Sequence, residues 1–160
     1  MTTETAMLET PAPHTLPSTP ALMQRLVSEF GAAWVKDEQQ NACISKTGDC
    51  VLFIAGDPVR FPECLDVAVV LPELQRHFSS RFRIAVAERD SEDGLAKRYG
   101  ATRRPALVFL RDGQYVTTVA GMLDWDDYLR EVAQALAMPP SRVPGIGIPL
   151  VSSIAVSACH

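Results

Sequence analysis

The sequence predicts an α/β fold in which a central mixed sheet carries helices on both faces. Three observations predict it. Short apolar runs typical of buried strands alternate with segments whose apolar residues recur at helical spacing. An Asp-Gly pair between two further apolar runs indicates a β-hairpin. A final amphipathic segment follows the hairpin, and this order of elements is typical of a sheet covered by helices on both sides.

The first part of the chain supplies two helices and two strands. Apolar residues at every fourth position of segment 22–30 predict an amphipathic helix, and a short strand is expected around 33–35. Acidic residues at the start of segment 37–45 favour a second helix there. The uninterrupted apolar run 50–55 predicts a strand that is buried on both faces and therefore lies in the middle of the sheet.

The clearest helix follows a loop that begins at Gly56. Its apolar residues recur at positions i, i+3, i+4, i+7 and i+11, namely Val67, Val70, Leu71, Leu74 and Phe78. Pro72 lies inside this pattern and is expected to kink the helix, because proline removes one backbone hydrogen bond. A second buried strand is expected over 82–87.

The second half of the chain completes the pattern. A helix over 90–99 should be closed by Gly100, and the predicted hairpin joins strands 106–110 and 115–120. Asp124 can cap the last helix, which should end before the following pair of prolines.

The length of 160 residues suits one folded domain, expected over 21–138, with a tail at each end. Residues 1–20 are rich in Thr and Pro and contain no Lys or Arg, which predicts a disordered tail. Residues 139–160 are apolar with interspersed Pro and Gly, which predicts an extended appendage. The start of the chain has neither the basic region nor the apolar region of a secretory signal, so we expect a cytoplasmic protein without stable membrane insertion.

Charge and cysteine content exclude several classes of function. A net charge of −4 argues against a nucleic-acid partner, because such proteins need clustered Lys and Arg, whereas a basic peptide is a natural guest. The four cysteines form no CxxC pair and no zinc-ligand spacing; they are Cys43, Cys50, Cys64 and Cys159. No metal, cofactor or catalytic triad is therefore expected, and the protein is not expected to be an enzyme.

Segment 97–113, which contains Arg104-Pro105, resembles the stretch of thioredoxins that carries their cis proline. The resemblance makes Pro105 the candidate cis residue. The helix that carries Pro72 resembles the thioredoxin helix that begins at the redox motif, and this alignment places Cys64 and Val67 at the two redox positions. Because a disulfide exchanger needs a second thiol, two-cysteine chemistry is impossible there. The fold expected from this resemblance is thioredoxin-like.

A longer resemblance rests on the run Gly56-Asp57-Pro58-Val59-Arg60-Phe61-Pro62-Glu63 together with segment 66–74. These residues resemble the HyaE/HupG/HoxO family of uptake [NiFe]-hydrogenase maturation proteins, and the likeness covers about residues 20–140. The resemblance implies a thioredoxin-like protein without active-site cysteines. It also implies a non-catalytic chaperone in the cytoplasm that binds the hydrogenase small-subunit precursor, including its twin-arginine signal peptide, before export. Other hydrogenase maturation factors are possible partners.

A receptor for two guanidiniums beside an apolar stretch needs carboxylates next to apolar surface. Glu63 and Asp66 are the leading candidates, with Asp57 beside them and Phe61 as an apolar neighbour. The simpler interpretation is that these acids only stabilise the positive end of the helix dipole. Arg60 can bind a peptide carboxylate or carbonyl, but the favoured interpretation is that it holds the loop by pairing with Asp57 or Glu63.

Two further groups are candidates of lower rank. Glu88 and Asp90 belong to an acidic cluster at the end of a predicted strand, where α/β sheets bind ligands, although a solvated surface is the simpler interpretation. Arg104 and Pro105 can offer backbone hydrogen bonds to an extended peptide. Trp34 is expected to pack in the core or at its edge.

Two other functions remain open. Cys64 lies near a helix N-terminus, where a lone thiol can become reactive, and a monothiol redox enzyme is therefore one alternative. The other is a structural subunit of a hydrogenase maturation complex that never meets the signal peptide.

Overall fold

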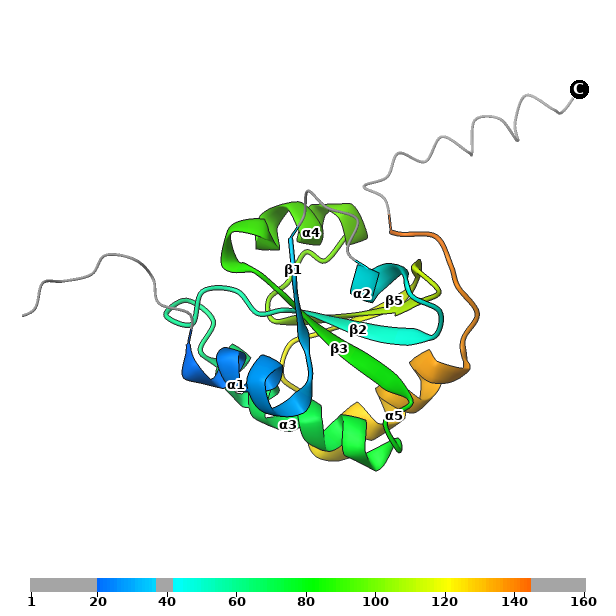
Figure 1. Cartoon of the computed structure of the whole chain (residues 1–160), viewed down its shortest axis with the longest axis horizontal. Helices are drawn as coiled ribbons and strands as arrows, with labels where there is room; N and C mark the ends of the chain where they lie inside the picture. The colour runs from blue at the N-terminus through cyan, green and yellow to red at the C-terminus, as the bar shows by residue number, and fades with distance from the viewer. Residues whose placement is uncertain (1–19, 37–41, 145–160) are drawn as a thin grey trace, which may run out of the picture.

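The computed structural model describes residues 20–36 and 42–144, and it is drawn in Figure 1. A five-stranded sheet in the order β1-β3-β2-β4-β5 forms its centre. In chain order the elements are α1 (Ala21–Phe30), β1 (Ala33–Val35), α2 (Ala42–Ser45), β2 (Asp49–Ile54), α3 (Glu63–His77), β3 (Phe82–Ala87), the 3-10 turn η1 (Arg89–Ser91), α4 (Glu92–Tyr99), β4 (Ala106–Arg111), β5 (Gln114–Ala120) and α5 (Trp125–Ala137). This is the predicted α/β architecture with a mixed sheet.

The sheet is mixed because its two halves are connected differently. β1, β3 and β2 are parallel and are joined through helices, whereas β4 is antiparallel to β2 and β5 is antiparallel to β4. β2 lies in the middle, and its Leu52 pairs with Ala85 on one side and with Val108 on the other. Five of the six residues of β2 are buried, as its uninterrupted apolar run predicts.

Helices cover both faces of the sheet (Figure 1). Because successive side chains of a strand point to opposite faces, Phe53 packs with α1, α3 and α5, whereas Leu52 packs with α2 and α4. Two separate apolar cores result, one on each face. The larger one contains Leu26 of α1, Leu71 of α3 and Val132 of α5.

Most predicted elements are present with small shifts at their ends. Pro72 lies inside α3, and Gly100 closes α4 with the left-handed backbone that favours glycine, at φ +67°. The helix predicted over 90–99 begins with a 3-10 turn. Asp124 occupies the N-cap position of α5, but its side chain accepts no capping hydrogen bond, so the capping prediction was wrong. The predicted N-terminal tail, the start of the helix predicted over 37–45 and most of the C-terminal appendage lie outside the described residues.

Three loops meet at one edge of the sheet. Since β2 and β3 are parallel, the loops that follow Ile54 and Ala87 leave the same edge. β4 runs in the opposite direction, and its first residue Ala106 pairs with Ile54, so the loop that precedes β4 lies at this edge too. That loop contains the cis peptide bond between Arg104 and Pro105, which confirms the expectation for Pro105.

Candidate functional site

Gly56 turns the chain as it leaves β2. Its backbone is left-handed, with φ +87°. A Cβ atom on this residue would lie 2.8 Å from Phe61 Cδ2 and 3.0 Å from Arg104 Cβ, so only glycine fits between the two loops. The loop then folds on itself, because Asp57 accepts hydrogen bonds at its backbone oxygen from the amides of Arg60 (3.0 Å) and Phe61 (2.7 Å). Asp57 Oδ1 also accepts one from the amide of Val59, at 2.9 Å.

Glu92 joins the loops at the centre of this edge. Among the residues that the structure describes, Glu92 is the charged side chain that is buried, with 5% of its surface exposed. The amide of Gly56 donates a hydrogen bond to Glu92 Oε2 at 2.5 Å, and Arg89 Nη1 donates one to Oε1 at 3.3 Å. Arg89 also pairs with Asp57, with 3.4 Å between Nη2 and Oδ2. Burial raises the pKa of the Glu92 carboxyl, while the Gly56 amide and the Arg89 and Arg104 guanidiniums act in the opposite direction.

Cys64 lies beneath the same loop and is fully buried. Its Sγ is 4.0 Å from the Gly56 carbonyl oxygen. Burial, followed by the charge of Glu92, raises the pKa of the thiol to about 11, although Arg89 acts in the opposite direction. The thiolate, which is the reactive form, is therefore strongly disfavoured at neutral pH. Cys50, the other cysteine whose side chain the structure describes, packs in the core on the other face of the sheet and therefore does not face Cys64.

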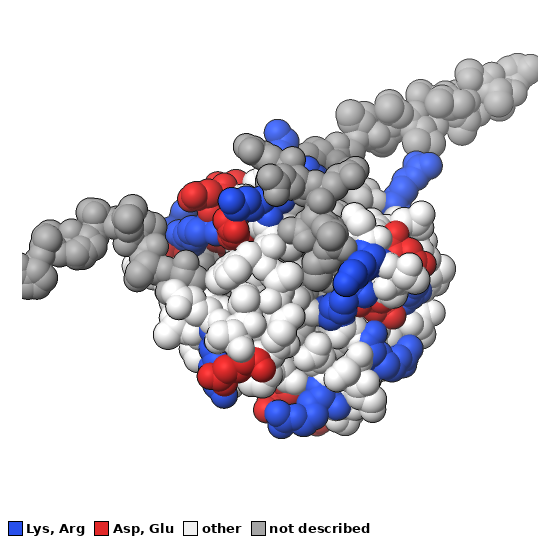
Figure 2. All heavy atoms as spheres, viewed as in Figure 1, with Lys and Arg blue, Asp and Glu red and all other residues white. Residues whose placement is uncertain are grey.

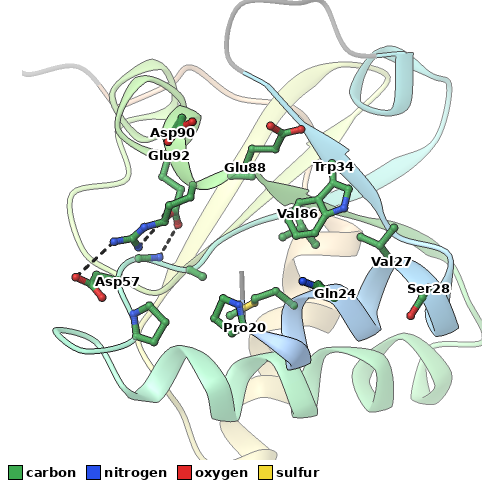
Figure 3. Close-up of a pocket in the computed structure, with 16 residues that line it drawn as sticks. Pro20, Gln24, Val27, Ser28, Trp34, Asp57, Val86, Glu88, Asp90 and Glu92 are labelled. Atoms are coloured by element: carbon green, nitrogen blue, oxygen red, sulfur yellow. Dashed lines mark hydrogen bonds and ion pairs between the residues drawn. The ribbon is translucent and has the colours of Figure 1, made fainter. Parts of the chain in front are cut away.

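A cavity of about 710 Å³ opens beside Gly56, between α1 and the ends of β2 and β3. We call it cavity 1 (Figure 3). Its lining residues are Pro20, Met23, Gln24, Val27, Ser28, Trp34, Ala55, Gly56, Asp57, Pro58, Val86, Ala87, Glu88, Arg89, Asp90 and Glu92. Val27, Trp34 and Val86 lie together at one end of cavity 1, and Asp57, with its ion pair to Arg89, lies at the other. The cavity therefore has an apolar wall and a charged wall.

A second cavity of about 540 Å³ lies on the other side of the same loop, and we call it cavity 2. Its lining residues are Gly56, Asp57, Arg60, Phe61, Arg89, Glu92, Asp93, Thr102, Arg103 and Arg104. Gly56, Asp57, Arg89 and Glu92 line both cavities and form the wall between them. Figure 2 shows acidic and basic side chains gathered at the α4 end of the molecule, next to a broad uncharged area.

The structure divides the predicted site residues into four sets, and Asp57 belongs to two of them. Asp57, Glu88 and Asp90 line cavity 1, and Asp57, Arg60, Phe61 and Arg104 line cavity 2. Pro105 is buried behind the cis peptide bond. Glu63 and Asp66, the leading candidates, are exposed in the first turn of α3 and line neither cavity.

The predicted role of Arg60 was wrong. Neither Asp57 nor Glu63 pairs with it. Asp57 pairs with Arg89, and the Arg60 guanidinium lies over the ring of Phe61 at 5.4 Å from its centroid. The loop is instead held by Arg89, which pairs with both Asp57 and Glu92. The sequence contains one indication of this pair, because Arg89 and Glu92 are opposite charges three positions apart just before and at the start of α4.

Two features are missing from the part of the chain that the structure describes. No described helix is both long enough and apolar enough to cross a membrane. Across residues 20–36 and 42–144, no group of three or more His, Cys, Asp or Glu side chains is arranged to hold a metal ion.

Comparison with known proteins gives one consistent result. The family model described as "Hydrogenase-1 expression protein HyaE" matches residues 22–128. The hydrogenase expression/formation protein HoxO of Cupriavidus necator is 59% identical over all of both chains. HoxO of Azotobacter vinelandii is 38% identical over 79% of this chain and 85% of its own. A mutant thioredoxin from Halobacterium salinarum, 22% identical, matches 68% of this chain and 94% of its own with a TM-score of 0.55, which shows the thioredoxin-like fold. The chain therefore belongs to the HyaE/HupG/HoxO family of hydrogenase expression and formation proteins.

Proposed function

We propose that this protein is a non-catalytic chaperone that holds the hydrogenase small-subunit precursor in the cytoplasm before export. In this proposal the twin-arginine part of the signal peptide binds in cavity 1. Membership of the family supports a role in hydrogenase expression and formation. The more specific role as a chaperone that binds the signal peptide is supported by the chemistry of the cavity. The observation that carries it is that the apolar wall of Val27, Trp34 and Val86 lines the same cavity as the acidic residues that follow β2 and β3.

The guest that suits this cavity is basic and apolar at once. A guanidinium forms strong, paired hydrogen bonds with carboxylates, and an adjacent apolar side chain gains free energy by packing on Trp34 and its neighbours. Asp57 and Glu92 are already engaged by Arg89. Glu88 and Asp90 have no ion-pair partner among the described residues, and both line cavity 1. These two carboxylates are therefore the proposed ligands of the arginine pair.

A binding role also agrees with the state of Cys64. A thiol whose pKa is raised to about 11 is a poor nucleophile at neutral pH, and the resemblance to thioredoxins places Val67 at the position of their second sulfur. The structure thus supports a protein that keeps the thioredoxin-like scaffold and the binding surface at the edge of its sheet without the thiol chemistry.

The proposal is tested by measuring the affinity of the purified chain for a synthetic signal peptide. The double variant Glu88→Gln/Asp90→Asn should bind it about tenfold more weakly, because two charge-assisted hydrogen bonds are lost from a partly exposed site. The matched variant Glu63→Gln/Asp66→Asn removes the same charge from the first turn of α3. It should change the affinity less than twofold.

The guest provides the second control. A peptide in which both arginines are replaced by glutamine should bind wild type as weakly as the normal peptide binds Glu88→Gln/Asp90→Asn. If the Glu63→Gln/Asp66→Asn variant is the one that loses binding, the peptide binds at α3 and not in cavity 1. Equal capture of full precursors with and without the arginine pair would instead support a structural subunit of a maturation complex.

The monothiol alternative has its own test. Wild type and Cys64→Ser should both fail to exchange disulfides with glutathione, and Cys64 should react with a thiol reagent only after the chain is unfolded, because the native thiol is buried and protonated. Exchange activity in wild type that disappears in Cys64→Ser would establish the redox function.

A further inference from the structure

Cavity 2 contains more guanidiniums than carboxylates. Arg60, Arg89, Arg103 and Arg104 line it together with Asp57, Glu92 and Asp93. The remaining lining residues are uncharged. This composition is the reverse of cavity 1, in which Arg89 faces four acidic residues. The two sides of the Gly56 loop therefore differ in the sign of their charge.

All three carboxylates of cavity 2 already have cationic partners. Arg89 pairs with Asp57 at 3.4 Å and with Glu92 at 3.3 Å. Arg104 Nη2 lies 3.1 Å from Asp93 Oδ1, and the Arg104 side chain, with only 15% of its surface exposed, also donates a hydrogen bond to the backbone oxygen of Ala101. The carboxylates are thus engaged by two of the four guanidiniums.

The other two guanidiniums, those of Arg60 and Arg103, have no ion-pair partner among the described residues. The Arg60 guanidinium is held over the Phe61 ring, and no described residue accepts a hydrogen bond from its donors. Arg103 comes from the loop before the cis peptide bond, and its Nη2 lies 3.7 Å from the position that a Cβ of Gly121 would occupy. Two loops that are distant in sequence thus place two unpaired cations on one cavity.

We propose that cavity 2 binds a carboxylate of a partner polypeptide, and that Arg60 and Arg103 are its ligands. A guanidinium presents its donors in a planar fork that matches the two oxygens of a carboxylate. Phosphate fits less well, because its second negative charge is repelled by the nearby Asp57, Glu92 and Asp93. The ligand is therefore an acidic side chain or a chain terminus.

The position of cavity 2 indicates which polypeptide supplies this group. Gly56, Asp57, Arg89 and Glu92 line both cavities, so one extended chain can cross this wall with a basic segment in cavity 1 and an acidic group in cavity 2. This identification of the polypeptide rests on the proposed function, whereas the carboxylate site itself does not. The protein would then bind a client with a basic segment and an adjacent acidic group more tightly than a client with the basic segment alone.

The site is tested on the ¹⁵N-labelled full chain by NMR titration, with signals from the arginine Nε–Hε groups. The probes are a capped alanyl-glutamyl-alanine peptide, its glutaminyl counterpart and inorganic phosphate at matched ionic strength. The glutamyl peptide should shift the signals of Arg60 and Arg103, and the glutaminyl peptide should not. The double variant Arg60→Gln/Arg103→Gln should bind the glutamyl peptide about tenfold more weakly.

The matched control is Arg76→Gln, which removes a guanidinium from the exposed side of α3 and should leave the affinity unchanged. The two single variants should each lose part of the affinity, and they keep the test valid if the double variant does not fold. Equal shifts with both peptides, or no shift at Arg60 and Arg103, would overturn the proposal. Tighter binding of phosphate would assign the cavity to a phosphate group instead. Because the probes contain no hydrogenase sequence, these results do not depend on whether the precursor binds.

Discussion

The acidic residues in the first turn of α3 and those that follow β2 and β3 carry the same charge in different surroundings. Glu63 and Asp66 extend from an exposed helix end into solvent. Asp57, Glu88 and Glu92, which we call the sheet-edge group, lie where three loops meet and line the same cavity as apolar side chains of α1 and β1. An acid that is fully exposed to solvent contributes little free energy of binding, because water and salt screen its charge. An acid in a cavity with an apolar wall is screened less and can contribute more. The comparison teaches that the surroundings of an acid, and not the number of acids, distinguish the candidate site at the sheet edge from the first turn of α3.

The largest effect is expected from Gly56, which holds the loops of the sheet-edge group together. Gly56→Ala should lower the free energy of unfolding by about 3 kcal/mol, because the left-handed backbone is strained and the new methyl group meets Phe61 and Arg104. Gly31→Ala is the matched control. Gly31 also has a positive φ, of +73°, but a Cβ there meets nothing within 4 Å, so the loss should be about 1 kcal/mol. Urea denaturation measures both, and equal losses would show that the loops are not closely packed at Gly56.

A smaller effect is expected from Glu92, the buried member of the sheet-edge group. Glu92→Ala should lower the free energy of unfolding by about 2 kcal/mol, because the Gly56 amide and the Arg89 guanidinium lose their acceptor. Glu63→Ala removes an exposed acid from the first turn of α3 and should change stability by less than about 0.5 kcal/mol. Chemical denaturation of the two variants side by side checks this difference. Similar values would mean that the two acidic groups are not distinct.

Local patterns were sufficient to predict most of the fold. The strand of Phe82–Ala87 was predicted with its observed bounds, since an apolar run between polar segments has few other solutions. The mixed sheet and the cis peptide bond before Pro105 were likewise confirmed. The resemblance to hydrogenase maturation proteins, drawn from the Gly56–Glu63 run, was confirmed by the family comparison.

The site was predicted less well, for a physical reason. The hydrogen bond from the Gly56 amide to Glu92 joins residues 36 positions apart, and only the strand order brings them together. Arg60 is close to Asp57 in the sequence and Arg89 is far from it, but the folded chain brings Arg89 and not Arg60 into an ion pair with Asp57. Sequence spacing shows which charges are neighbours along a helix, but it does not show which loops share an edge of the sheet.

The smallest effect is the dependence of stability on pH, which comes from the buried carboxyl of Glu92. The pKa of Glu92 in the folded chain is raised above the ordinary value of 4.5, chiefly by burial. Below this ordinary value the carboxyl is protonated in both the folded and the unfolded chain, so its contribution to stability is fully present. As the pH rises, the unfolded chain ionises first, and the contribution is lost until the pH passes the folded pKa, with a slope of at most about 1.4 kcal/mol per pH unit.

Glu92→Gln cannot ionise and should lack this loss. Urea denaturation of wild type and Glu92→Gln at a series of pH values from 4 upward should therefore give curves that differ in slope just above the ordinary glutamate pKa, with wild type falling relative to the variant. A Glu92→Gln curve parallel to wild type would show that the folded chain ionises Glu92 as easily as the unfolded chain does, and burial would then not raise the pKa of this carboxyl.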